Sequence, residues 1–313
     1  MLKVGRGPVG VELRSVKETK LSKFADALES GKFVVTAELN PPKGTDIDPL
    51  LEKARMLNGR VDAFNLTDSH SSLMAMAPTA VAHRLLDEGV EPILQITCRD
   101  RNRIALQSDL LGASFLGVSN LLCMTGDPPG AGDHPDAKPV FDLEAIALLK
   151  SIASLESGQD MGGAKLKGAP TFFPGAVANP GVPDLEREVR RMEEKVEAGA
   201  RFFQTNAVYD PPAFERFMNV AQRFNVPILA GFIMLKSGNM ARNLNANLPG
   251  VTVPDEMVRE FDESSDRRET SVEIAARVIK DIRPMCQGVH IMAIGWEAQI
   301  PQVLEQAELT HAV

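Results

Sequence analysis

Short apolar runs alternate with amphipathic segments along nearly all of the 313 residues. Runs such as 91–98 and 226–233 are rich in aliphatic residues and are bounded by Gly, Pro or charged residues, which is typical of buried strands. The pattern predicts eight strands, at residues 33–38, 61–66, 91–98, 119–124, 170–176, 201–205, 226–233 and 288–294.

The segments between these strands repeat apolar residues three and four positions apart, the spacing that predicts amphipathic helices. Residues 1–20 are polar, and we expect them to lie on the surface or to pair as an extra edge element. Residues 157–169, rich in Gly and Lys, are predicted to be an exposed excursion, and the stretch from 234 to about 266 a long basic-to-acidic excursion. Helices are predicted at residues 21–31, 48–57, 74–86, 102–116, 142–155, 183–199, 211–224, 270–285 and 296–308.

Strands that alternate with helices at intervals of roughly 30 residues predict an α/β fold, the (β/α)₈ TIM barrel. The alternative is an open, doubly wound sheet, which needs fewer strands and usually a glycine-rich turn after the first one. Here the first turn reads LNPPKG, at residues 39–44, so the GxGxxG motif is absent. No long linker divides the chain. We therefore expect one catalytic barrel domain over residues 1–313, with residues 1–30 as an N-terminal extension.

The overall charge of −8 argues against nucleic acid or an anionic membrane as the main partner. No apolar run approaches the roughly 20 residues that would span a bilayer, and the N-terminus lacks the apolar core of a signal peptide. The three cysteines, Cys98, Cys123 and Cys286, lie far apart, so no disulfide framework or iron–sulfur motif is predicted. These observations favour a cytoplasmic protein.

Glu38 follows an apolar run directly and is itself followed by Pro41 and Pro42, which stop further strand pairing. Burial of an unpaired carboxylate is costly, so a buried strand that ends in one needs an explanation. The active site of a (β/α)₈ barrel lies at the carboxyl ends of its strands, which is where Glu38 would lie as a catalytic acid. The alternative is that Glu38 only ends the strand and faces water.

The other predicted strands also end in groups that form hydrogen bonds, as a large polar ligand would require. Asp127 would be a second carboxylate on the same face, and two neighbouring carboxylates can take different protonation states. The alternative for Asp127 is a turn residue, because Gly126–Gly130 reads GDPPG. The polar strand-end residues include Thr67, Asp68, Thr97, Arg99, Asp100, Asn179, Gln204, Thr205, Asn206, Lys236 and Glu297.

The five histidines show no metal-ligand spacing, so no metal site is predicted. His290 lies inside the last predicted strand, and we interpret it as a core histidine rather than a base. Lys195 lies near the C-terminal end of a strongly charged predicted helix, 183–199, where it could reach a phosphate.

Five segments of this sequence resemble methylenetetrahydrofolate reductases in the same order. The resemblance covers roughly residues 30–305, and its most specific parts are TGDPPG and EAGARFFQT. The chain is similar to the compact prokaryotic form, which is a catalytic barrel without a regulatory domain. The segments are AELNPP (37–42), QITC (95–98), LLCMTGDPPG (121–130), KVEAGARFFQTN (195–206) and GVHIM (288–292).

The resemblance implies a flavoprotein of one-carbon metabolism and methionine biosynthesis, with FAD as cofactor and FMN as the alternative. Reduced flavin would pass a hydride to 5,10-methylene-tetrahydrofolate and give 5-methyl-tetrahydrofolate. Glu38 matches the family's general acid, which protonates N10, and Asp127 matches a carboxylate that stabilises the resulting iminium cation. Thr67, Thr97, Gly126, Asp127, Asn179 and Lys195 match cofactor-binding positions, and Gln204, Asn206 and Lys236 are expected to bind the substrate.

Several positions depart from the better-known bacterial form. Leu39 and Asn40 replace two aromatic residues after the acid, and Thr125 stands where an arginine is common. The electron donor is therefore expected to be NAD(P)H or an accessory iron–sulfur subunit, within a homo-oligomer or a heteromeric complex. Further departures are Gln95 and Asn179 in place of histidines and Asn206 in place of glutamine.

Two other functions stay open: a pterin-binding barrel methyltransferase and a non-catalytic folate-binding subunit of a larger complex.

Overall fold

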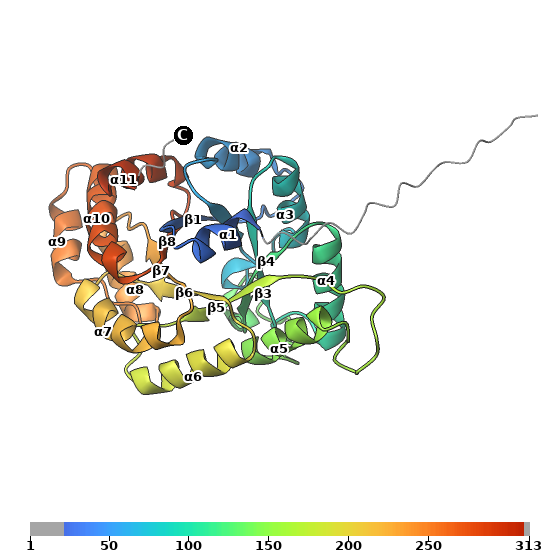
Figure 1. Ribbon diagram of the computed structural model, residues 1–313. Helices are drawn as coiled ribbons and strands as arrows, with labels where there is room; N and C mark the ends of the chain where they lie inside the picture. The colour runs from blue at the N-terminus through green and yellow to red at the C-terminus, as the bar shows by residue number, and fades with distance from the viewer. Residues whose placement is uncertain (1–21, 310–313) are drawn as a thin grey trace, which may run out of the picture.

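A computed structural model of the chain describes residues 22–309 and shows a closed barrel of parallel strands in the order β1 to β8 (Figure 1). The (β/α)₈ fold predicted from the alternating pattern is confirmed. The barrel closes because β8 pairs with β1 in parallel register, with Thr36 opposite His290. The strands are β1 (Val34–Leu39), β2 (Ala63–Leu66), β3 (Pro92–Thr97), β4 (Asn120–Met124), β5 (Phe173–Ala178), β6 (Phe202–Ala207), β7 (Ile228–Ile233) and β8 (Gly288–Met292).

Helices surround the barrel and bury their apolar faces against the outside of the strands (Figure 1). Polar side chains start several of them by accepting main-chain N–H groups, as Asn102 does for α4 and Asp210 for α7. The helices that follow the strands are α2 (Asp48–Leu57), α3 (Pro78–Asp87), α4 (Arg103–Phe115), α5 (Ala145–Glu156), α6 (Leu185–Glu197), α7 (Pro211–Ala221), α10 (Arg267–Ile282) and α11 (Ile300–Gln306).

A short helix, α1 (Lys23–Glu29), closes the amino-terminal end of the barrel. Phe24 is fully buried and packs edge-on against Phe202, with ring centroids 5.2 Å apart, and against Phe173 at 6.1 Å. These aromatic side chains fill the lower interior of the barrel, below the layer where the polar side chains begin. Residues 1–20, predicted as a surface or edge element, lie outside the described residues.

The stretch from 234 to 266, predicted as an excursion, contains two helices, α8 (Gly238–Asn247) and α9 (Asp255–Glu263). That prediction was wrong because the abundant polar residues hide a helical repeat: Met257, Val258 and Phe261 are buried on one face of α9. Ser237 begins α8 by accepting the N–H of Met240. In contrast, residues 157–169 form turns and one isolated β-bridge.

Several helix boundaries differ from the predicted ones. The helix predicted from Asp142 begins at Ala145, because the Asp142 carboxylate accepts hydrogen bonds from the guanidinium of Arg103 instead of starting the helix. The helix predicted from residue 270 begins three residues earlier, where Asp266 provides the cap. Residues 296–308 form a short 3₁₀ turn, η5 (Glu297–Gln299), followed by α11.

Candidate active site

A polar cavity of about 440 Å³ opens at the carboxyl ends of the strands, between the segments that follow β2 to β6. Its lining brings together six of the residues predicted from the sequence as cofactor or substrate ligands. They come from loops and strand ends that are far apart in the chain, which the closed barrel brings to one mouth. The six are Thr97, Gly126, Asp127, Asn179, Lys195 and Asn206.

Glu38 lies near the carboxyl end of β1 and is 8% exposed, and it is not among the residues that line this cavity. Its Oε2 is 3.9 Å from Nε2 of His290, which is itself buried on β8. His290 was interpreted from the sequence as a core histidine, and it is indeed buried with a polar partner. Its position next to Glu38 was missed, although a closed barrel requires the first and last strands to be neighbours.

A chain of buried polar side chains supports His290 inside the barrel. Nδ1 of His290 is 2.9 Å from Oγ1 of Thr36, and Nε2 of Gln204 donates to the same hydroxyl at 3.5 Å. The amides of Gln204 and Asn65 bond reciprocally, at 2.7 and 3.1 Å. When Thr36 accepts from Gln204, its own proton goes to Nδ1 of His290, and Nε2–H then points towards Glu38. Gln204, expected to bind substrate, therefore lies below the mouth as part of this hydrogen-bonded series of side chains.

Two other predicted ligands lie on the rim. Thr67 donates its hydroxyl to Oδ1 of Asn40 at 2.8 Å, which ties the end of β2 to the turn after β1. Lys236 follows β7; its Nζ donates to the carbonyl of Ile294 and lies 5.5 Å from the ring centroid of Trp296. Lys236 is half-buried.

Lys195 is a buried cation that has no carboxylate partner among residues 22–309. It projects from α6, is 7% exposed and donates to the carbonyl oxygen of Val177 at 2.6 Å. Burial lowers the pKa of Lys195, an effect that the nearby Glu188 partly opposes. Arg191 lines the same part of the cavity. The Glu188 carboxylate lines the cavity as well and accepts the N–H of Asn179 at 3.0 Å. The two cations on this wall form a suitable place for a phosphate.

Asp68 and Arg101 form a buried ion pair beneath the cavity. The Asp68 carboxylate also accepts the main-chain N–H of Thr97 at 2.8 Å and its hydroxyl at 2.9 Å. The Thr97 hydroxyl is therefore fixed in orientation, and the Asp68 carboxylate is held by one cation and two hydrogen-bond donors. Arg101 and Asp68 are 33 positions apart in the chain, and nothing in the local sequence indicates that they pair.

The backbone conformation at position 126 and the closeness of its neighbours both favour glycine there. Its φ is +93°, and a Cβ at this position would lie 3.0 Å from Cβ of Thr97. The next residue, Asp127, has an exposed side chain, and its carboxylate makes no hydrogen bond or ion pair with any residue in the described part of the chain. Its position therefore depends on the main chain of the loop after β4.

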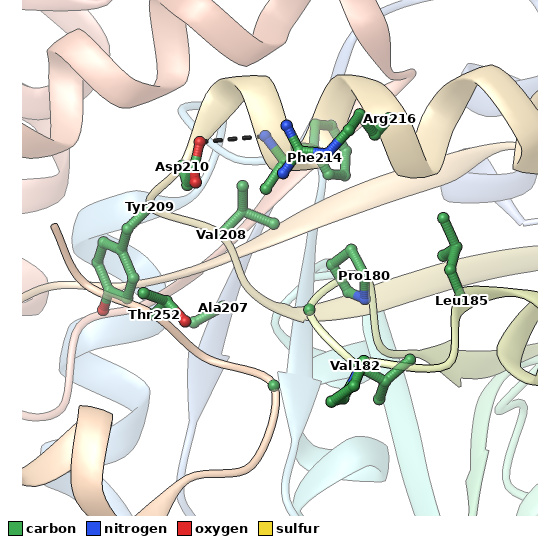
Figure 2. A pocket seen from close by; sticks show the side chains of 14 residues that line it. Pro180, Val182, Leu185, Ala207, Val208, Tyr209, Asp210, Phe214, Arg216 and Thr252 are labelled. Atoms are coloured by element: carbon green, nitrogen blue, oxygen red, sulfur yellow. Dashed lines mark hydrogen bonds between the residues drawn. The ribbon is translucent and has the colours of Figure 1, made fainter.

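A second cavity, of about 380 Å³, lies between the loops after β5 and β6 and residues 250–252 (Figure 2). Its walls are mostly apolar side chains such as Val208, Leu185 and Phe214. Its carboxylate, Asp210, accepts the N–H of Ala213 at 3.0 Å and thereby begins α7 (Figure 2). Because that carboxylate has a structural role, the polar cavity is the better candidate for chemistry.

The described residues contain no group of three or more His, Cys, Asp or Glu side chains that could hold a metal ion. Among them there is also no helix long and apolar enough to cross a membrane. Burial raises the pKa of Cys98 to about 11, so this thiol beneath the mouth stays protonated near neutral pH.

Comparison with known proteins points to a single family. Methylenetetrahydrofolate reductase 2 of Schizosaccharomyces pombe is 22% identical over 312 residues, which are 93% of this chain and 48% of the relative. The probable methylenetetrahydrofolate reductase (NADH) of Oryza sativa subsp. japonica is 24% identical over 225 residues, which are 69% of this chain and 38% of the relative. The chain thus spans about half or less of the length of these curated relatives.

A solved structure of an uncharacterized protein from Clostridium thermocellum, which binds two copies of 5-methyl-5,6,7,8-tetrahydrofolic acid, shares the fold. The TM-score is 0.64 at 15% identity, with 91% of this chain and 98% of that chain covered. A family model described as methylenetetrahydrofolate reductase matches residues 23–308, which is almost the whole barrel. The chain belongs to the methylenetetrahydrofolate reductase family.

Proposed function

We propose that this chain is a flavin-dependent reductase that converts 5,10-methylene-tetrahydrofolate to 5-methyl-tetrahydrofolate. The observation that carries the proposal is the position of Glu38: a nearly buried carboxyl group near the carboxyl end of β1, 3.9 Å from a buried imidazole, in a barrel whose polar cavity opens at the same ends of the strands. A carboxyl group withdrawn from water in this way is suited to deliver a proton to a bound substrate.

The cavity residues fit a flavin nucleotide. Lys195 and Arg191 would hold its phosphate, because they are cations on one wall and Lys195 has only a carbonyl as partner. The hydroxyl of Thr97, the amide of Asn179 and the main chain at Gly126 would bind the polar edges of the ring system and its tail. Reduced flavin, when bound, supplies the hydride. FAD is the expected form and FMN the alternative.

Glu38 would act on the folate. Proton transfer from its carboxyl group to N10 lets the bond between N10 and the one-carbon unit break, and the electron pair of that bond remains on N10. The carbon is then an iminium carbon attached to N5, which accepts the hydride and becomes the methyl group. His290 holds the carboxyl group in place, since it lies between Glu38 and the Thr36 hydroxyl.

The remaining predicted residues would hold the iminium and the substrate. The exposed carboxylate of Asp127 supplies a negative charge near the developing cation, which lowers the barrier most where water is excluded. Asn206, at the end of β6, can form hydrogen bonds with the pterin or the amide of the folate. Lys236 can pair with a folate carboxylate from the rim.

The electron donor is proposed to be NAD(P)H or an accessory iron–sulfur subunit. NADH appears in the name of the Oryza sativa relative, and NADPH in that of a Caenorhabditis elegans relative. These names describe proteins more than twice as long as the matched region. Anaerobic reduction of the flavin by NADH, NADPH and reduced ferredoxin, tried in turn, distinguishes the donors.

The decisive experiment separates the two half-reactions of Glu38→Gln by stopped-flow absorbance. The variant should bind flavin and be reduced at the wild-type rate, yet react with methylene-tetrahydrofolate about 10²- to 10⁴-fold more slowly. A matched control is Glu52→Gln on α2, which leaves the mouth unchanged. Equal losses in both half-reactions would contradict the role of Glu38. A purified protein without flavin absorbance would instead favour the methyltransferase or the non-catalytic folate-binding subunit.

A further inference from the structure

The turn that follows β2 has an unusual backbone. Ser69, Ser71 and Ser72 have φ values of +52°, +51° and +58°, in the left-handed region that residues with a side chain rarely adopt. Such a segment keeps its shape only when its surroundings hold it firmly, and it is found most often beside functional sites. Two sets of contacts therefore matter: those that stabilise this turn, and those by which the turn positions another segment.

Arg99, at the end of β3, holds the turn. Its side chain is 3% exposed, and its Nη1 donates to Oγ of Ser72 at 3.1 Å and to the carbonyl of Ser69 at 3.4 Å. The other edge of the guanidinium bonds to Asp100, with Nε–Oδ1 at 2.9 Å and Nη2–Oδ2 at 2.7 Å. The guanidinium is therefore fixed in its plane and directed at Ser72.

Ser72 in turn contacts the loop that carries Asp127. Arginine can only donate, so the Ser72 hydroxyl must accept from Arg99, and its single proton is left for another acceptor. That proton is shared between the main-chain carbonyls of Asp127 and Pro128, both 3.1 Å from Oγ. The hydrogen bonds thus run in one direction, from Arg99 through Ser72 to the backbone of Asp127.

The two loops are also in close contact on either side of this bond. A Cβ at Gly132 would lie 1.9 Å from the carbonyl oxygen of Ser72, so the backbones touch there. Further along, the N–H of Met74 donates to Oδ1 of Asp133 at 3.0 Å, and Lys43 pairs with the same carboxylate. The loop after β4 is therefore held against the segment after β2 over residues 127–133.

We propose that Ser72, oriented by Arg99, is the positioning residue for Asp127 in the reaction proposed above. The Asp127 carboxylate makes no hydrogen bond or ion pair within the described chain, although it is among the carboxylates, Asp100 foremost, that raise the pKa of the Arg99 guanidinium. The Ser72 hydroxyl, which bonds to the Asp127 carbonyl, thus helps to fix the backbone from which the carboxylate projects. This inference rests on the proposed function, because it concerns the step in which Asp127 faces the cationic substrate.

A double-mutant cycle tests the proposal, with the rate of the folate half-reaction as the readout. Ser72→Ala removes one hydrogen bond and should slow this half-reaction about tenfold, while reduction of the flavin by its donor stays unchanged. In an Asp127→Asn background the same substitution should have no further effect, because the group that it positions is already gone. Ser157→Ala removes a hydroxyl that donates to Ser154 in a distant turn and serves as the control.

A tenfold loss in both backgrounds would overturn the proposal, since Ser72 would then act independently of Asp127. An Asp127→Asn variant that reacts at the wild-type rate would also overturn it; the proposed function would still stand if Glu38→Gln remained defective. Arg99→Lys keeps a cationic donor and should retain part of the rate, whereas Arg99→Met should match Ser72→Ala. Thermal unfolding shows whether each variant is folded. If Arg99→Met does not fold, the double-mutant cycle of Ser72 and Asp127 decides the question without it.

Discussion

Thr36 on β1 and His290 on β8 face each other across the seam where the barrel closes, with Oγ1 and Nδ1 2.9 Å apart. They are separated by 254 positions in the chain, yet they lie in direct register. The pair fixes the imidazole ring on the side of Glu38, so closure of the fold and support of the proposed acid depend on the same contact.

His290→Gln should therefore weaken proton delivery without affecting the flavin. We expect the folate half-reaction to slow by about tenfold to a hundredfold, because Glu38 remains but is no longer held by the ring. The rate of flavin reduction by the donor should stay at the wild-type value. Stopped-flow traces of both half-reactions provide the measurement, and His83→Gln on α3 is the control. A variant with normal folate kinetics would remove His290 from the mechanism.

Lys195 should make phosphate binding unusually sensitive to alkaline pH. Burial lowers the pKa of Lys195 from the ordinary 10.5, so the ammonium loses its proton at a lower pH than an exposed lysine. Below the lowered value the lysine is charged and attracts phosphate, and above it that attraction is lost. The dissociation constant of FMN, followed by quenching of its fluorescence, should therefore begin to rise below pH 10.5.

The control for this experiment is Lys195→Met, which should bind FMN more weakly at neutral pH and show little of the alkaline rise. Lys150→Met, an exposed position on α5, should behave like the wild type. An alkaline rise of equal size in Lys195→Met would show that another group is responsible.

Two glycines offer a matched test of backbone strain. Gly126→Ala should destabilise the protein by about 1–3 kcal/mol, because φ is +93° and the new methyl group would lie 3.0 Å from Cβ of Thr97. Gly112→Ala on α4 should stabilise it by up to about 1 kcal/mol, because a Cβ there meets nothing within 4 Å and alanine favours helices. Urea unfolding followed by circular dichroism gives both values. Similar values for the two variants would contradict this account of the loop after β4.

Much of this architecture follows from local sequence. The apolar runs predict the strands, and the rule that strand ends meet at one mouth places Thr97, Asp127 and Asn179 together. The position of His290 beside Glu38 depends on the pairing of the first and last strands, and no short pattern contains that information. The helices α8 and α9 were missed for another reason: asparagines in α8 and charged residues in α9 surround the few apolar residues that form their buried faces.

The helix α1 has a consequence for the supply of protons. Phe24, Phe173 and Phe202 occupy the lower barrel and are at most 2% exposed, so within residues 22–309 these rings close that end to water. If Glu38 is the proposed acid, it gives up its proton in every catalytic cycle and must be reprotonated from the other end of the barrel. That end is the mouth, which a folate bound as proposed would cover. Reprotonation of Glu38 would therefore follow departure of the product, because the aromatic rings at the lower end of the barrel leave no other route for the proton within the described residues.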